Sequence, residues 1–210
     1  MVDAGGITVT GFEPLAVQSD DADNDAVQTG DDEAEGAVRH AFPGLTAEEF
    51  KLAFRNHPAG VAVITADAGD GPVGLTATSV FSVSAEPPLL VFSLSSTSSS
   101  APTIRKASTL VVHLLTSDQV DAAKLFATSG VDRFADASTW SRLPTGEPYL
   151  VGAPVWLRGA VIDRMEAGGS TVVAVHALES SVSHQGAEPN PLVYHNRTWH
   201  HLGDHSRLDH

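Results

Sequence analysis

The chain carries a series of short apolar runs, rich in β-branched residues and separated by turn residues, and this pattern limits its fold most strongly. The runs cover residues 61–66, 73–84, 89–94, 110–116, 155–165, 171–183, 192–194 and 198–202. Runs of this kind, bounded by glycine, proline or aspartate, predict β-strands. Many short strands with few helices favour an antiparallel barrel that is closed or nearly closed.

Three segments have the features of helices instead of strands. Residues 46–56 begin with Thr46 and Glu49, which have the spacing of a capping box, and continue with apolar residues at helical intervals. Residues 100–107 and 118–128 predict two further short helices. We therefore expect a mainly β domain with flanking helices.

Acidic residues are concentrated at the start of the chain. The chain has 210 residues and a formal net charge of −14, and residues 1–40 hold 10 acidic residues and a single basic one. A segment this acidic, with few aromatic residues, cannot bury enough apolar surface to offset the entropy of ordering. We therefore expect an acidic disordered tail over residues 1–43, a folded domain over residues 44–203 and a short C-terminal tail over residues 204–210.

Composition argues against several classes of function. The chain has no cysteine, which excludes disulfides, thiolate metal sites and cysteine nucleophiles. The negative charge disfavours nucleic acid and anionic membranes as partners. No apolar run reaches the length of about 18 residues that a membrane span needs, and the first residues lack a secretory pattern, so we expect a cytoplasmic protein. The C-terminal histidines lack a firm ligand spacing, so no metal site is predicted.

Two segments are unusually rich in hydroxyl side chains. They are GLTATS at residues 74–79 and SSTSSS at residues 95–100, the second after an apolar run. Small side chains let the backbone approach a ligand closely, and hydroxyl and backbone N–H donors suit phosphate oxygens. If Ser99 and Ser100 open the next helix, its N-terminal N–H groups also favour an anion. The pattern indicates a phosphate site, although the same composition is typical of flexible loops and solvent-facing strands.

The first of these segments belongs to a longer pattern. Residues 74–90, GLTATSVFSVSAEPPLL, resemble the signature of the flavin reductase-like, FMN-binding split-barrel family, the short-chain flavin reductases of two-component monooxygenases. Shorter matches are FRNHPAGVAVIT at residues 54–65, SSS at 98–100, DRF at 132–134 and PLVYH at 191–195. The resemblance covers residues 45–203. It implies a six-stranded antiparallel split barrel with flanking helices, which forms a homodimer and binds flavin at the dimer interface.

The resemblance also implies which residues contact the flavin. Residues of the two hydroxyl-rich segments would line the isoalloxazine, ribityl and phosphate groups: Thr76, Ala77, Thr78, Ser79, Ser95, Ser99 and Ser100. His113 and His195 stand at positions near the flavin, although His113 is equally typical of a buried polar residue and His195 of a strand surface. No catalytic acid or nucleophile is predicted, because the flavin itself supplies the hydride chemistry.

The function that the resemblance implies is hydride transfer from NADH or NADPH to FMN or FAD, with the reduced flavin passed to a partner monooxygenase. One departure keeps an alternative open. Reductases of this family often carry G-D-H in the later hairpin, and its histidine is associated with the nicotinamide nucleotide. Here the place is taken by Gly168, Gly169 and Ser170. The alternative is a split-barrel flavin-binding oxidoreductase or carrier that does not use NAD(P)H.

Overall fold

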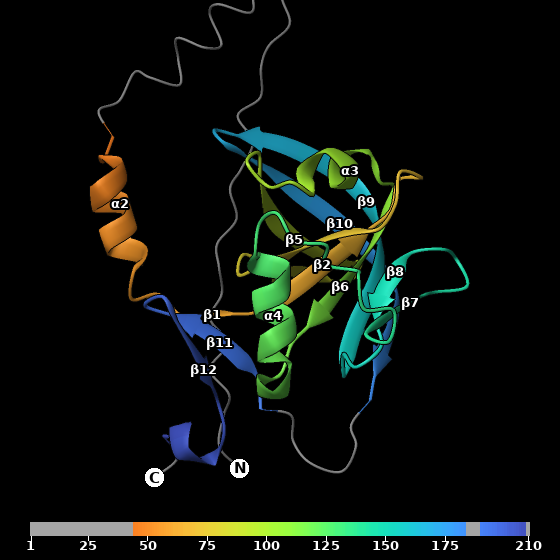
Figure 1. Cartoon of the computed structure of the whole chain (residues 1–210). Helices are drawn as coiled ribbons and strands as arrows, with labels where there is room; N and C mark the ends of the chain where they lie inside the picture. The colour runs from red at the N-terminus through yellow and green to blue at the C-terminus, as the bar shows by residue number, and fades with distance from the viewer. Residues whose placement is uncertain (1–43, 184–189, 209–210) are drawn as a thin grey trace, which may run out of the picture. The chain divides into compact units, whose positions relative to one another are not determined.

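The computed structural model describes residues 44–183 and 190–208 (Figure 1). The chain divides into two units, Met1–Leu45 and Thr46–His210, and all the helices and strands described below belong to the second. The expected acidic tail over residues 1–43 lies outside the described residues.

The three predicted helices are present, each somewhat shorter than expected. They are α2 (Ala47–Phe54), α3 (Ala101–Lys106) and α4 (Val120–Ala127), with a 3₁₀ turn η1 (Ser117–Gln119) directly before α4. The predicted capping box of α2 is confirmed: the Glu49 N–H donates to Thr46 Oγ1 at 3.3 Å, and the Thr46 N–H donates to Glu49 Oε2 at 2.8 Å. Two otherwise unpaired N–H groups are thereby satisfied at the start of this helix.

Seven strands form one antiparallel sheet, in the order β3-β2-β6-β9-β10-β5-β4. These strands are β2 (Ala62–Ala66), β3 (Val73–Ala77), β4 (Phe81–Ala85), β5 (Pro88–Ser95), β6 (Thr109–Leu114), β9 (Val155–Ala167) and β10 (Ser170–Val182). Buried apolar residues from β2, β3, β5, β6 and β10 join α3 in a single cluster. The sheet therefore curls around this cluster, and α3 closes one side of it.

Two smaller sheets complete the described part of the chain. In the first, β11 (Leu192–His195) pairs with β1 (Ala59–Gly60) and with β12 (Thr198–His201). In the second, β7 (Trp140–Arg142) pairs with β8 (Pro148–Leu150). A second apolar cluster packs α4 against β2, β8 and β11. This cluster fixes α4 and the hairpin of β11 and β12 on the main sheet.

The structure corrects two expectations. The sheet has seven strands rather than six, and its end strands β3 and β4 are not paired with each other, so a closed barrel is not formed. The single strand expected over residues 73–84 is two strands, because the chain turns at residues 78–80, where the Ser93 N–H donates to Ser79 Oγ at 2.9 Å. A 3₁₀ turn, η2 (Asp204–Ser206), lies within the segment expected as a C-terminal tail, and that expectation stays a prediction.

Candidate functional site

A hydroxyl-lined pocket lies between β3 and β5, two strands that are not neighbours in the sheet. It has a volume of about 290 Å³, and its floor and walls come from both hydroxyl-rich segments and the end of α4. Its hydroxyl side chains are Thr76, Ser93, Ser95, Thr97, Ser98, Ser99 and Ser129. One cation, Arg133, lines the pocket, and none of the described lining residues is acidic. We call this the Arg133 pocket.

Arg133 is held against the serine segment by neutral acceptors. Its Nη1 donates to Gly74 O at 3.1 Å, to Ser100 Oγ at 3.1 Å and to Ser99 Oγ at 3.3 Å, and its Nη2 donates to Thr128 O at 2.7 Å. Burial lowers the pKa of the Arg133 guanidinium, which nevertheless stays charged at neutral pH. Its buried Nε has no hydrogen-bond partner among the described residues, so the pocket carries a positive charge that no described carboxylate neutralises.

The sequence predicted serine contacts in this pocket but did not assign Arg133. The DRF motif at residues 132–134 was the available signal, since it matches the family pattern. Arg105, a second arginine that follows the serine segment, points elsewhere. Its Nη2 donates to Thr171 Oγ1 at 2.9 Å and lies 3.8 Å from Glu166 Oε2. Arg133 is therefore the cation that this pocket offers to an anion.

The predicted residues at the Arg133 pocket have distinct positions. Ser95 and Ser99 are exposed at its rim, where a ligand can reach their hydroxyl groups. Thr76 lines the wall and donates from Oγ1 to Ala123 O at 2.6 Å, which ties β3 to α4. Ser100 is only 1% exposed and donates from Oγ to Gly74 O at 2.7 Å. Ser100 therefore positions Arg133 and the β3 backbone, and its own hydroxyl is withdrawn from the pocket.

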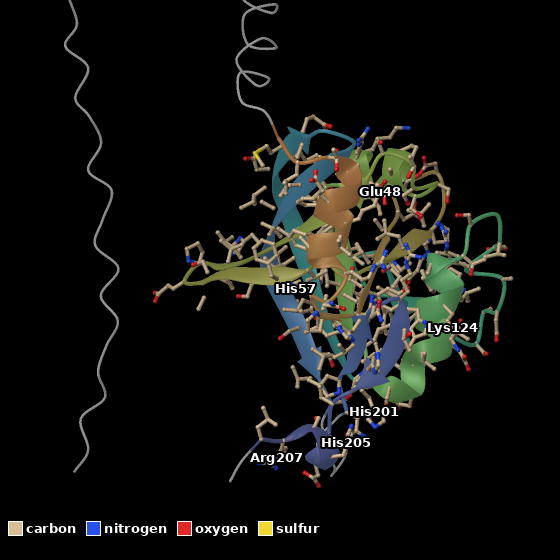
Figure 2. All side chains as sticks on the ribbon, turned by 90° about the vertical axis from the view of Figure 1, so that its left-hand side faces the viewer. Glu48, His57, Lys124, His201, His205 and Arg207 are labelled. Atoms are coloured by element: carbon tan, nitrogen blue, oxygen red, sulfur yellow. The ribbon has the colours of Figure 1, made fainter. Side chains whose placement is uncertain are left out.

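Two other predicted residues line a separate and larger groove. Thr78 and Ser79 line it together with residues of α2 and of the β11–β12 turn. The groove has a volume of about 780 Å³, and we call it the α2 groove. Figure 2 faces this side of the domain, with Glu48 on α2 and His57 just beyond the helix. Residues 74–79 thus contribute to two cavities, whereas residues 95–100 line the Arg133 pocket alone among the two.

The remaining predicted residues, Ala77, His113 and His195, lie outside both cavities. The Ala77 side chain is buried in the core and lines neither cavity. His113 is fully buried: its Nδ1 bonds to Val63 O at 3.0 Å, and its Nε2 accepts from the Leu150 N–H at 3.0 Å. Both ring nitrogens are used by the backbone, which matches the interpretation of His113 as a buried polar residue and leaves neither nitrogen for a ligand.

Desolvation lowers the pKa of His113 to about 4, so its imidazole is neutral at physiological pH. The neutral ring donates from Nδ1 and accepts at Nε2, which is the tautomer that these two backbone contacts require. His195 is half-buried beside His200, with ring centroids 5.6 Å apart. Its flavin contact stays a prediction.

The β9–β10 hairpin brings the altered G-D-H position against the Arg133 pocket. The Ser96 N–H and Oγ both donate to Gly169 O, at 3.0 and 2.8 Å, and Ser170 pairs with Ser95. The place of the missing histidine therefore lies beside the serine segment. The substitution changes the immediate surroundings of the pocket, rather than a remote part of the domain.

Among the described residues, no three histidine, aspartate or glutamate side chains lie close enough to hold a metal ion. No helix in the described ranges is long and apolar enough to cross a membrane.

Comparison with known proteins gives the family. A model of the flavin reductase like domain matches residues 54–203, so this chain belongs to the flavin reductase-like family. The NADH:FMN oxidoreductase of Rhodococcus qingshengii is 46% identical over 157 residues, which are 72% of this chain and 80% of that protein. The NADH:riboflavin 5′-phosphate oxidoreductase of Streptomyces pristinaespiralis is 36% identical over 166 residues, which are 79% and 93% of the two chains.

Solved structures agree with this assignment. The flavin reductase domain protein of Arthrobacter sp. FB24 is 34% identical with a TM-score of 0.72, and the match covers 79% of this chain and 99% of that one. The flavin reductase component of a bacterial two-component tryptophan halogenase is 26% identical with a TM-score of 0.67, and the match covers 76% and 99% of the two chains.

Proposed function

We propose that this chain is a flavin reductase that transfers hydride from NADH or NADPH to FMN or FAD. The observation that carries the proposal is the Arg133 pocket. It is positively charged and lined by hydroxyl groups, and none of its described lining residues is a carboxylate. Bound flavin accepts a hydride from a nicotinamide ring, so the protein needs to bind and orient the two rings rather than to supply a nucleophile.

The Arg133 pocket suits the terminal phosphate of FMN. A phosphate dianion needs strong donors and a positive charge, and Arg133 offers both beside the exposed hydroxyls of Ser95 and Ser99. The orphaned Nε of Arg133 supplies a further reason for an anion at this place, because a buried unpaired donor is costly. Thr78 and Ser79, in the adjoining α2 groove, then border the flavin ring.

The donor is inferred from the relatives, whose names specify NADH together with FMN or riboflavin 5′-phosphate. Ser170 motivates the second candidate function, a flavin-binding oxidoreductase or carrier that does not use NAD(P)H, because the imidazole associated with the nucleotide is missing. A serine beside Ser95 still offers a hydroxyl at this position. We favour the reductase because relatives named for that activity match this chain over 80% and 93% of their own length.

We further propose that the sheet is a split barrel and that two copies associate through its outer face. Several residues that face away from the core are apolar and are paired with one another: Phe81 beside Val91, Val91 beside Ala174, and Val172 beside Met165. Polar residues interrupt this face, since Asp163 pairs with Ala174 and Ser93 pairs with Val172. Phe81 and Met165 are 60% and 59% exposed. Large apolar side chains this exposed, grouped on one face of the sheet, suit burial against a second copy of the chain.

Relatives include the reductase component of a 4-nitrophenol monooxygenase and that of a tryptophan halogenase. We propose that this chain likewise supplies reduced flavin to a flavin-dependent monooxygenase or related enzyme.

Steady-state turnover tests the function. Purified full-length protein is mixed with FMN or FAD and with NADH or NADPH, and the oxidation of the nicotinamide is followed by absorbance. Flavin-dependent oxidation of either nucleotide supports the reductase. Tight binding of FMN with no oxidation of either nucleotide would leave the carrier alternative.

A further inference from the structure

The turn between β11 and β12 places an arginine where the backbone favours glycine. His195 pairs with Thr198, so Asn196 and Arg197 form a two-residue turn, with φ of 47° and 61°. A two-residue hairpin turn with both φ values positive favours asparagine followed by glycine, because glycine has no Cβ to clash in this region. Asn196 follows the preference and Arg197 does not. An arginine in this conformation costs stability, which points to a use for its side chain.

No hydrogen bond or ion pair among the described residues occupies the Arg197 guanidinium. Its side chain lines the α2 groove, opposite two further cations, Lys51 and Arg55. Lys51 has one partner, the exposed Glu48 at 2.9 Å, and such surface pairs are weak. None of the described residues that line the groove is acidic. The chain as a whole has a net charge of −14, so a groove lined by three cations and no acidic residue is a locally positive surface.

The same groove also offers flat apolar surfaces. Phe50 and Phe54 lie on α2 with ring centroids 4.7 Å apart, and Tyr194 lines the groove with them. Aromatic rings of this kind stack on planar heterocycles. The volume of about 780 Å³ lies in the range of sites that hold a large organic ligand. A ligand that combines planar rings with a negatively charged linker fits both properties, and a dinucleotide has this chemistry.

We propose that Lys51, Arg55 and Arg197 form an anion site for the diphosphate of a dinucleotide in the α2 groove, and that the dinucleotide is the nicotinamide donor. The proposal rests on the proposed reductase function. FMN has a single phosphate, which the Arg133 pocket satisfies, so the second anion site is not needed for FMN. Its cations would hold the donor with the nicotinamide directed toward Thr78 and Ser79.

The test uses Arg197→Gly in the full chain, with Lys124→Met as the matched control. Glycine adopts the positive φ without strain, so this variant should unfold at the same or a higher temperature than the parent. Lys124 is an exposed cation on α4, 3.7 Å from Asp121 and outside the α2 groove (Figure 2). With FMN as acceptor, Arg197→Gly should raise the KM for the donor about tenfold, which is typical of one lost charged contact. In Arg197→Gly the kcat and the KM for FMN should not change. Lys124→Met should have the same kcat and KM values as the parent.

Calorimetry with ADP gives a readout that does not depend on turnover. ADP should bind the parent and Lys124→Met with equal affinity and bind Arg197→Gly about tenfold more weakly. Equal ADP affinity for the parent and Arg197→Gly would overturn the anion site. If Arg197→Gly raises the KM for FAD and leaves the KM for the donor unchanged, the donor assignment is overturned. The cations would then bind the ADP half of FAD. If the parent oxidises neither NADH nor NADPH, the proposed function fails, while the ADP titration still decides the anion site.

Discussion

Arg133→Met is the substitution that tests the Arg133 pocket most sharply. Methionine keeps most of the apolar stem and removes the guanidinium. A charged hydrogen bond contributes about 1.5–3 kcal/mol, so the dissociation constant for FMN should rise roughly 10- to 150-fold. The fold itself should tolerate the change, because Gly74 O keeps its bond from Ser100 Oγ at 2.7 Å. Thr128 O, in an exposed contact, loses its bond from Arg133 and can turn to water.

The assay compares FMN with riboflavin, which has the same ring and ribityl chain but no phosphate. Quenching of flavin fluorescence gives both dissociation constants. Arg133→Met should weaken FMN binding and leave riboflavin binding nearly unchanged. Arg105→Met is the matched control, since Arg105 contacts Thr171 and Glu166 outside the pocket, and it should change neither constant. Equal loss of FMN and riboflavin affinity in Arg133→Met would refute the assignment of Arg133 to the phosphate.

Three further predictions concern pH, packing and assembly. The free energy of unfolding should fall by about 3 kcal/mol between pH 6.5 and 4, because the unfolded His113 imidazole takes a proton while the buried one, with a pKa of about 4, resists it. Urea titrations would show this slope, and His113→Leu should abolish it between pH 6.5 and 5. Gly74→Ala should lower stability by about 1–3 kcal/mol, since the new methyl lies 2.5 Å from Phe126 Cε1 and 3.0 Å from Ile64 O; thermal unfolding measures this. Val172→Glu should convert a dimer into monomers by sedimentation velocity, because Val172 lies on the outer apolar face of β10.

Each of these has a result that contradicts it. An unchanged pH slope in His113→Leu would assign the titration to another group. The carboxyls of Asp67 and Glu147 have lowered pKa values, because hydrogen bonds outweigh the desolvation by burial. The stability that they contribute is present at neutral pH and is lost mainly below about pH 5, so it does not explain a slope between pH 6.5 and 5. Parent-like unfolding of Gly74→Ala would show that Phe126 moves freely. A Val172→Glu variant that stays dimeric would place the interface elsewhere, and a monomeric parent would reject the dimer.

Local signals in the sequence predicted the local structure well. The capping box at Thr46 and Glu49 marks the start of α2, and the apolar runs mark most strands of the main sheet. The break at residues 78–80 could not be predicted, because it depends on Ser79 meeting the Ser93 backbone 14 residues away. The short pair of β7 and β8 was missed for a similar reason, since three-residue strands have almost no periodic signal.

The candidate site, too, could be predicted only where it depends on local sequence. The hydroxyl-rich segments could be found by composition, and both line cavities in the structure. The burial of Ser100 and His113 depends on packing against distant strands, so composition could not separate them from exposed neighbours. Arg133 follows the serine segment by more than 30 residues, and the fold brings its guanidinium to Ser99 and Ser100. Its role could be inferred only from geometry.

The central claim is that this chain binds flavin and reduces it with a nicotinamide nucleotide. Anaerobic stopped-flow absorbance tests it directly: the protein with FMN bound is mixed with excess NADH, or with NADPH in a parallel run. We expect rapid loss of the oxidised-flavin band with one of the two nucleotides. Retention of the band with both nucleotides, in protein that holds FMN, would contradict the reductase function and leave only a flavin carrier or an oxidoreductase with another donor.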